Sequence, residues 1–215
     1  MGTVDFAPFA SQAGKVSGGG GDGGAIGTAV RLALEPAEAE RAAPGDGSLV
    51  RSAQRGSEEA IELLFRRHWR HAHRAAYLIV RDADAAEDIA QEAFLSALRA
   101  LDRFDRRRPF RPWLHRIVVN RAIDHARARA LRREVGEEQL AEPTAPDAAH
   151  GIDPDLVAAL ADLDAEQRAA VVLRYLLDYT PGEIARMLGV PRGTVNSRLR
   201  RGLDRLADAL EGVLG

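Results

Sequence analysis

The chain has 215 residues, of which 46% are apolar, and a formal net charge of −2. This length suits one or two globular domains, and the near-neutral charge by itself favours no class of partner. The absence of cysteine excludes disulfides and thiolate metal sites. No apolar run reaches about 18 residues, so we expect no transmembrane helix. The N-terminus lacks the basic start and apolar core of a signal peptide.

The N-terminal segment, residues 1–48, is predicted to be disordered. Residues 17–27 read SGGGGDGGAIG, and such a stretch has too few apolar side chains to offset the entropy of ordering it. A misassigned start codon is the alternative, with the valine codons of Val30 or Val50 as initiators. No function is assigned to this segment.

Two amphipathic helices are predicted next, over residues 57–80 and 84–101. Ser57 fits an N-cap, and Asp84 opens a capping-box pattern that closes at Glu87. Helical spacing places these residues on the inward faces: Ile61, Leu64, Phe65, His68, Ala72, Ala75, Ala76, Ile79, Ile89, Ala90, Ala93, Phe94, Ala97, Leu98 and Leu101. The histidines at 68, 71 and 73 have no acid or cysteine among them and do not favour a metal site.

The outer face of the second helix carries a small acidic group with one apolar residue. It is formed by Asp88, Gln91, Glu92 and Leu95. The spacing alone favours a solvated face. The alternative is an acidic docking surface with Leu95 as an exposed apolar contact.

A strongly basic block covers residues 99–133, with 12 Arg and 3 Asp and thus a net charge of +9. Residues 104–111 are predicted to be a loop, because Pro109 and Pro112 disfavour helix just before them. Pro112 can then open the next helix. The aromatic residues Phe104, Phe110 and Trp113 alternate with arginines. This pattern suits unstacked bases and phosphates, or equally an aromatic core covered by arginine.

An acidic linker is predicted over residues 134–154, where five proline and glycine residues separate two helical units. Its composition favours a solubilising tether. Residues 155–215 then read as about four helices. Asp164 caps one of these, and the sequence YTPGEIARMLGVPRGTVNSRLRRGLDRL (179–206) follows it.

That last sequence has the pattern of a helix-turn-helix. Thr180 and Glu183 form a capping box, and Gly189 suits the left-handed conformation that ends a helix. In the second helix Val195, Leu199, Leu203 and Leu206 are predicted to face inward. Arg192, Asn196, Arg200 and Arg201 are predicted to face outward. The second helix of this motif enters the DNA major groove, so we predict DNA binding.

Two sequences together resemble one family. Residues 163–206, from LDAEQRAAVV to RRGLDRL, look like region 4 of sigma-70-type factors, which binds the −35 promoter element. DADAAEDIAQEAFLSALRAL (82–101) and FRPWLHRIVVNRAIDHARAR (110–129) look like region 2, which binds the polymerase clamp and the −10 element. Both regions without an intervening domain resemble the extracytoplasmic-function (ECF, group IV) sigma factors.

The resemblance implies an all-α protein of two small helical domains, region 2 over 49–133 and region 4 over 155–215, joined by a flexible acidic linker. It implies promoter DNA and core RNA polymerase as partners, through the β′ coiled coil and the β flap, and a cytoplasmic location. An anti-sigma factor is a common partner in the family. The polymerase-binding residues it implies are Asp88, Gln91, Glu92 and Leu95.

The resemblance also implies two DNA-binding sets. The −10 set is Phe104, Arg107, Arg108, Phe110, Arg111, Trp113, Asn120, Asp124 and Arg127. The −35 set is Arg192, Thr194, Asn196, Ser197, Arg198, Arg200 and Arg201. Family members commonly carry a basic residue where Asn196 stands, so changed specificity is expected there first.

No enzyme is predicted, because the sequence offers no nucleophile–base pair, metal cluster or phosphate-binding glycine loop, and no cofactor is expected. The main alternative is a stand-alone helix-turn-helix regulator with an N-terminal ligand or dimerisation domain. Such a regulator binds its operator tightly without polymerase, whereas a sigma factor needs the core enzyme.

Overall fold

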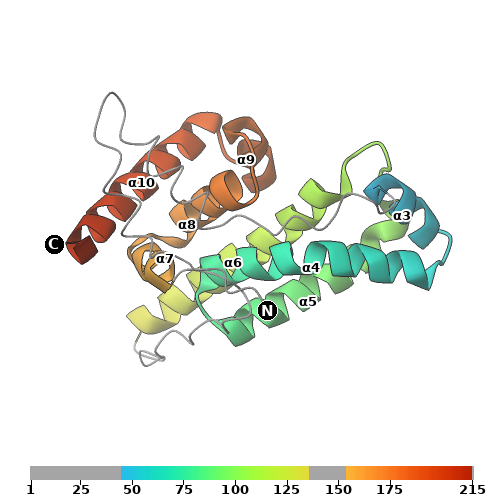
Figure 1. The fold of residues 1–215 in the computed structure, drawn as a ribbon, viewed down its shortest axis with the longest axis horizontal. Helices are drawn as coiled ribbons and strands as arrows, with labels where there is room; N and C mark the ends of the chain where they lie inside the picture. The colour runs from blue at the N-terminus through green and yellow to red at the C-terminus, as the bar shows by residue number, and fades with distance from the viewer. Residues whose placement is uncertain (1–44, 136–153, 215) are drawn as a thin grey trace, which may run out of the picture.

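The structure is a computed structural model that describes residues 45–135 and 154–214, and these ranges form helices and turns without a β-strand (Figure 1). The first domain contains α3 (Asp46–Ala53), α4 (Glu58–Val80), α5 (Ala83–Ala100), the 3-10 turn η1 (Leu101–Arg103) and α6 (Phe110–Glu134). The second contains α7 (Pro154–Ala159), the 3-10 turn η3 (Leu160–Asp162), α8 (Ala165–Val171), the π-helical turn η4 (Val172–Leu176), α9 (Pro181–Leu188) and α10 (Arg192–Leu214). The expected all-α class with two small helical domains is confirmed.

Helix α3 corrects the predicted N-terminal boundary. It begins at Asp46, whereas residues 1–48 were expected to be disordered. The Asp46 carboxylate accepts a hydrogen bond of 2.8 Å from Arg67 and lies 3.0 Å from His68 Nε2, both on α4. Leu49 and Val50 are buried against the first domain. Because these partners are distant in sequence, local composition does not reveal the helix. Residues 1–44 lie outside the described part of the chain.

The junction between α4 and α5 confirms one predicted cap and corrects another. The Ser57 side chain accepts from the backbone N–H of Ala60, as expected. The cap of α5 is Asp82, whose side chain accepts from the backbone N–H of Ala85 at 3.0 Å, and the predicted cap Asp84 lies inside the helix. The reason is Arg81, whose left-handed φ of 60° ends α4 and leaves the next residue extended.

Helix α6 begins earlier than its prolines suggest. Its first residue is Phe110 and its cap is Pro109, so Phe110 and Arg111 are helical and the predicted loop over 104–111 is two residues too long. Pro112 is the third helical residue. The N–H groups of the first turn have no partner within a helix, so a proline there loses no intrahelical hydrogen bond.

The second domain follows its local sequence signals. Asp164 caps α8 by accepting from the backbone N–H of Gln167 at 2.7 Å. Thr180 and Glu183 form the predicted capping box at the start of α9. Gly189 ends α9 with a left-handed φ of 67°, and this turn leads into α10. These three predictions are confirmed.

The two domains pack against each other. Helix α8 and turn η4 contact α4, and α8 and α9 contact α6, as the neighbouring ribbons in Figure 1 show. Buried residues of both domains form one continuous apolar cluster. The predicted linker over 134–154 overlaps α6 at Glu134 and α7 at Pro154, and residues 136–153 lie outside the described part of the chain.

Candidate nucleic-acid and polymerase interfaces

The helix-turn-helix presents a polar face on α10. Val195, Leu199, Leu203 and Leu206 are buried, as the sequence predicted. On the other side Arg192, Asn196, Arg200 and Arg201 are exposed, while Thr194, Ser197 and Arg198 are half-buried at its edge. All seven predicted −35 residues therefore have an accessible or partly accessible polar side chain. Six of them lie on the first turns of α10, and Arg201 follows directly after them.

One hydrogen bond within α10 and one close approach to α8 characterise the two sides of this helix. The Arg201 guanidinium donates to the Ser197 hydroxyl at 2.9 Å, so these two predicted DNA contacts are bonded to each other. On the buried side a Cβ added to Gly202 would lie 3.1 Å from a Val171 methyl and 3.3 Å from a Leu163 methyl. The absence of a side chain at residue 202 thus lets α10 lie close to α8, which sets the direction in which the exposed arginines point.

The aromatic residues of the basic block form a cluster. The Phe104 and Trp113 ring centroids are 4.6 Å apart, and those of Phe110 and Trp113 are 5.6 Å apart. Phe104 and Phe110 are only 8% and 5% exposed, whereas Trp113 is half-buried. Both phenylalanines thus belong to an aromatic core and not to a base-stacking surface, because rings that are covered to this extent cannot stack on a base.

The arginines of the block surround a hollow beside this cluster. A cavity of about 380 Å³ lies between α3 and residues 104–111. It is lined by Asp46, Gly47, Val50, Phe104, Arg106, Arg107, Arg108, Pro109, Phe110 and Arg111. Arg107, Arg108 and Arg111 are exposed. The wall that α3 contributes was not predicted from the sequence, because α3 itself was not predicted.

The outer face of α5 is accessible. Asp88, Gln91, Glu92 and Leu95 are all exposed, and the Leu95 side chain is 50% exposed. Glu92 accepts a hydrogen bond of 2.7 Å from Arg121 on α6. The prediction that Phe65 and Leu98 face inward is wrong, because they are 39% and 36% exposed.

These two residues belong to an apolar hollow next to that face. A cavity of about 280 Å³ lies between α4 and α5 and is lined by Glu58, Ile61, Glu62, Leu64, Phe65, Phe94, Ala97, Leu98, Leu101 and Phe110. The Phe65 ring stacks on Trp69 with centroids 4.8 Å apart. The sequence signals this exposed apolar hollow only through the number of apolar residues on α4 and α5, which is larger than one buried helix face requires.

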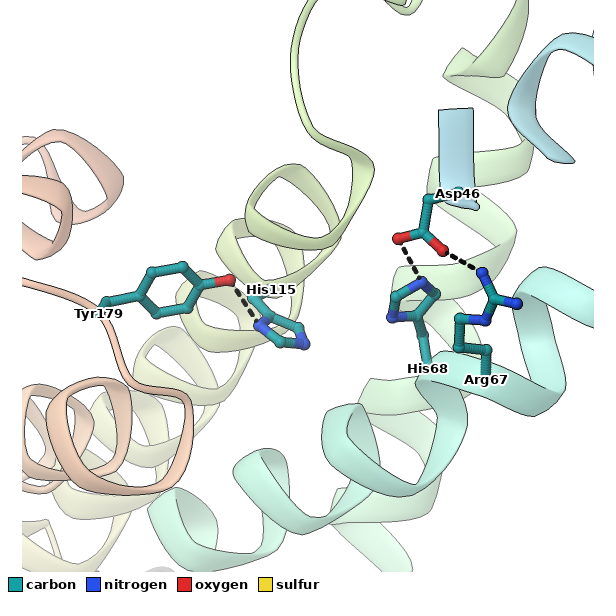
Figure 2. Close-up of polar contacts among 5 residues, drawn as sticks. All are labelled: Asp46, Arg67, His68, His115 and Tyr179. Atoms are coloured by element: carbon teal, nitrogen blue, oxygen red, sulfur yellow. Dashed lines mark hydrogen bonds and ion pairs between the residues drawn. The ribbon is translucent and has the colours of Figure 1, made fainter. Parts of the chain in front are cut away.

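Two of the polar contacts between the described parts of the domains join His115 to Tyr179 and Arg127 to Glu166. His115 on α6 is fully buried, and its Nδ1 lies 2.9 Å from the hydroxyl of Tyr179, which precedes α9 (Figure 2). Burial lowers the pKa of His115 well below its usual value and raises the pKa of Tyr179, so both side chains are neutral. This pair links residues that are 64 positions apart.

The second contact involves a predicted −10 residue. Arg127 Nε on α6 donates to Glu166 on α8 at 2.6 Å. Burial alone would raise the pKa of Glu166, but the hydrogen bond from Arg127, a backbone hydrogen bond and the charges of Arg127 and Arg198 together lower it. Of the remaining predicted −10 residues, Asp124 is exposed and Asn120 is half-buried on the same helix.

The described residues contain neither a metal-binding group nor a membrane-spanning helix. Within 45–135 and 154–214 no group of three or more histidine or acidic side chains is placed to hold a metal ion. No helix in these ranges is both long and apolar enough to cross a membrane.

The fold places the chain among helix-turn-helix proteins that carry a second basic surface on a separate helical domain. Comparison with protein families matches residues 64–132 to Sigma-70 region 2 and residues 155–206 to Sigma-70, region 4. The ECF RNA polymerase sigma factor SigM of Mycobacterium tuberculosis (strain ATCC 25618 / H37Rv) is 40% identical over 175 residues, covering 77% of this chain and 84% of SigM. The ECF RNA polymerase sigma factor SigW of Bacillus subtilis (strain 168) is 30% identical over 179 residues, covering 76% of this chain and 96% of SigW.

Two solved structures are similar to this chain in fold. CnrH in complex with the cytosolic domain of CnrY gives a TM-score of 0.59 at 28% identity, covering 78% of this chain and 97% of CnrH. The sigma factor RpoE in complex with the anti-sigma factor NepR from Bartonella quintana gives a TM-score of 0.55 at 27% identity, covering 65% of this chain and 89% of that chain. The chain belongs to the ECF family of sigma-70-type RNA polymerase sigma factors, and it is a sigma factor of transcription initiation. The alternative of a stand-alone regulator is not favoured.

Proposed function

We propose that this sigma factor brings core RNA polymerase to promoters by contacting DNA at two places, with α10 on the −35 element and the basic hollow of the first domain on the −10 element. The observation that carries the proposal is the presence of two exposed arginine surfaces on two separate helical domains. The bond chemistry of transcription belongs to the polymerase, so this chain acts as a specificity subunit rather than an enzyme.

At the −35 element, the first turns of α10 enter the major groove. Arg192, Asn196 and Arg200 are exposed there and offer donors, and in the case of Asn196 also an acceptor, to base edges and phosphates. The Arg201 guanidinium is held by Ser197, and this suits a phosphate contact of fixed direction.

At the −10 element, the cavity of about 380 Å³ has room for an unstacked base. Arg107, Arg108 and Arg111 surround it and would hold the phosphates of the separated strand. Phe104 and Phe110 then form its floor instead of stacking platforms, and the half-buried Trp113 is the ring that remains partly accessible.

The polymerase would dock on the outer face of α5. Asp88, Gln91 and Glu92 supply polar contacts around Leu95. Leu98 and Phe65 extend this surface with apolar area. We add them to the docking surface, because exposed apolar patches with a polar rim mark protein contacts.

The protein would act in the cytoplasm, where it would alternate between polymerase and an anti-sigma factor. In the packed arrangement Arg127 is engaged by Glu166, so one proposed −10 contact is already occupied. Separation of the domains would release it for DNA.

The test is transcription in vitro from a library of genomic fragments with purified core polymerase, with and without this chain. We expect promoter-dependent transcripts only when both are present, and weak promoter binding by the chain alone. Leu95→Asp should remove the transcripts, whereas Leu131→Asp, at a leucine that is 62% exposed on α6, should keep them. Tight operator binding without polymerase, or no transcript from any fragment, would refute the proposal.

A further inference from the structure

Four arginines meet where the two domains join. A cavity of about 120 Å³ is lined by Arg81 at the end of α4, Arg129 and Arg133 on α6, and Arg168 on α8. The remaining lining residues are Val80, Ala126, Ala130 and Ala161. The walls therefore combine cationic ends with small apolar side chains and come from both domains. None of the proposed DNA or polymerase contacts lies among them.

Local structure directs each guanidinium to this place. Arg81 has the left-handed φ of 60° that ends α4, an unusual conformation for a residue other than glycine. Arg129 and Arg133 are four residues apart on α6 and so share one helix face. Arg168 lies in the middle of α8 and enters from the second domain.

The arginines of this cluster repel one another, and nearby acids act in the opposite direction: Asp162 on Arg81, and Asp164 and Glu166 on Arg168. Arg129 donates to Asp82 at 3.1 Å. Burial, followed by the charge of Arg133, lowers the pKa of Arg81. Burial, followed by the charge of Arg81, lowers the pKa of Arg168 to about 10. Like charges held together in a partly desolvated place repel one another, and a further counter-charge between them would reduce this repulsion.

Unpaired donors mark where that counter-charge belongs. The Nε–H groups of Arg81 and Arg168 are buried and have no hydrogen-bond acceptor within the described chain. Buried donors without an acceptor are uncommon in folded proteins and indicate an ion or ligand that completes them. A water molecule needs only about 10–15 Å³ of such a cavity, so the space accommodates a larger group.

We propose that this cavity is a binding site for a phosphate group, which the four guanidiniums would surround. Arginine is the preferred partner of phosphate because its planar fork donates two hydrogen bonds to one oxyanion. The same chemistry occurs in free phosphate, in a nucleotide and in the DNA backbone. The small cavity between the domains favours a free phosphate or the terminal phosphate of a nucleotide.

Binding there would stabilise the packed arrangement of the domains. Arg168 belongs to one domain and the other three arginines to the other, so a phosphate held by all four joins them. A ligand that binds the packed form better than the separated form shifts the equilibrium toward packing. The binding itself does not depend on the proposed promoter function, and its test requires neither DNA nor polymerase.

The experiment measures the melting temperature of the full-length chain in sodium phosphate, in ADP, and in sodium chloride of equal ionic strength. At a ligand concentration tenfold above Kd the melting temperature should rise by about 3–6 °C in phosphate or ADP compared with chloride. A melting temperature that is the same in phosphate, ADP and chloride overturns the proposal.

Matched variants separate binding from folding. Arg168→Gln and Arg133→Gln should abolish the shift, and Arg103→Gln, at an exposed arginine outside the cavity, should retain it. Without phosphate, Arg168→Gln should melt at or above the wild-type temperature, because it removes a desolvated charge that Arg81 and Arg133 repel. A lower melting temperature, with the phosphate shift retained, overturns the assignment. A short DNA duplex is the last arm: a shift that only the duplex produces, and that Arg168→Gln abolishes, assigns the site to the DNA backbone and overturns a free ligand.

Discussion

Replacement of Tyr179 by phenylalanine tests the contact between the two domains. The change removes the hydroxyl that lies 2.9 Å from His115 Nδ1 and keeps the ring. His115 Nε2 is already buried without a partner in the described chain, so the variant leaves both ring nitrogens of a fully buried imidazole unsatisfied. Such a loss costs roughly 1–3 kcal/mol, which shifts the equilibrium between packed and separated domains toward separation by roughly 5- to 150-fold.

The assay is energy transfer between dyes on the two domains. Because the chain has no cysteine, Asp102→Cys and Asp208→Cys introduce the only two thiols, at exposed positions of the first and second domain. Tyr179→Phe should lower the transfer efficiency compared with wild type. The control is Tyr175→Phe, the same chemical change at a half-buried tyrosine of η4 whose ring lies beside Arg174. Equal efficiencies for the two variants would refute the reasoning.

Three further predictions concern pH, α3 and DNA. Burial keeps His115 neutral in the folded chain, whereas this histidine gains a proton below about pH 6.5 in the unfolded chain. Urea titrations should therefore show the free energy of unfolding falling by up to about 1.4 kcal/mol per pH unit below that value, and His115→Asn should flatten this slope. Burial alone would raise the pKa of Asp46, but His68 and Arg67 lower it from 3.8 to about 2. Asp46→Asn should therefore cost about 1–2 kcal/mol in chemical denaturation at pH 7, allowing for its partial exposure, and the difference should vanish between about pH 4 and 2. Arg200→Ala should weaken binding of the holoenzyme to promoter DNA by about 1–3 kcal/mol in a sequence-dependent way, and an unchanged affinity in filter binding would contradict a base contact.

Features set by a few neighbouring residues were predictable from the sequence. The capping box of Thr180 and Glu183 and the left-handed Gly189 need only contacts within their own turn. The two helical domains follow from the spacing of apolar residues, which depends on the helix period rather than on any partner. Local sequence signals are therefore sufficient to locate the helix-turn-helix and its polar face.

Features decided by distant contacts were not predictable. Asp82 and Asp84 both suit an N-cap, and the choice between them depends on the backbone of Arg81 and on the bond from Arg129, 47 residues away. Helix α3 is held by Asp46 through α4, and its sequence gives little local sign of this. The alternation of aromatic and arginine residues is equally compatible with a core and with a nucleic-acid surface, because periodicity does not reveal which rings are covered.

The charge pattern of the sequence has a counterpart in the packing of the domains. Residues 99–133 carry a net charge of +9, and residues 134–166 contain ten acids and no basic residue. Glu166 is the last of these acids, and it accepts from Arg127 of the basic block at 2.6 Å across the domain junction. Because Arg127 is also a proposed −10 contact, the acid that stabilises the packed arrangement competes with DNA for the same guanidinium. The arginine cavity formed by Arg81, Arg129, Arg133 and Arg168 lies at the same junction, so the two sites would respond together when the domains separate.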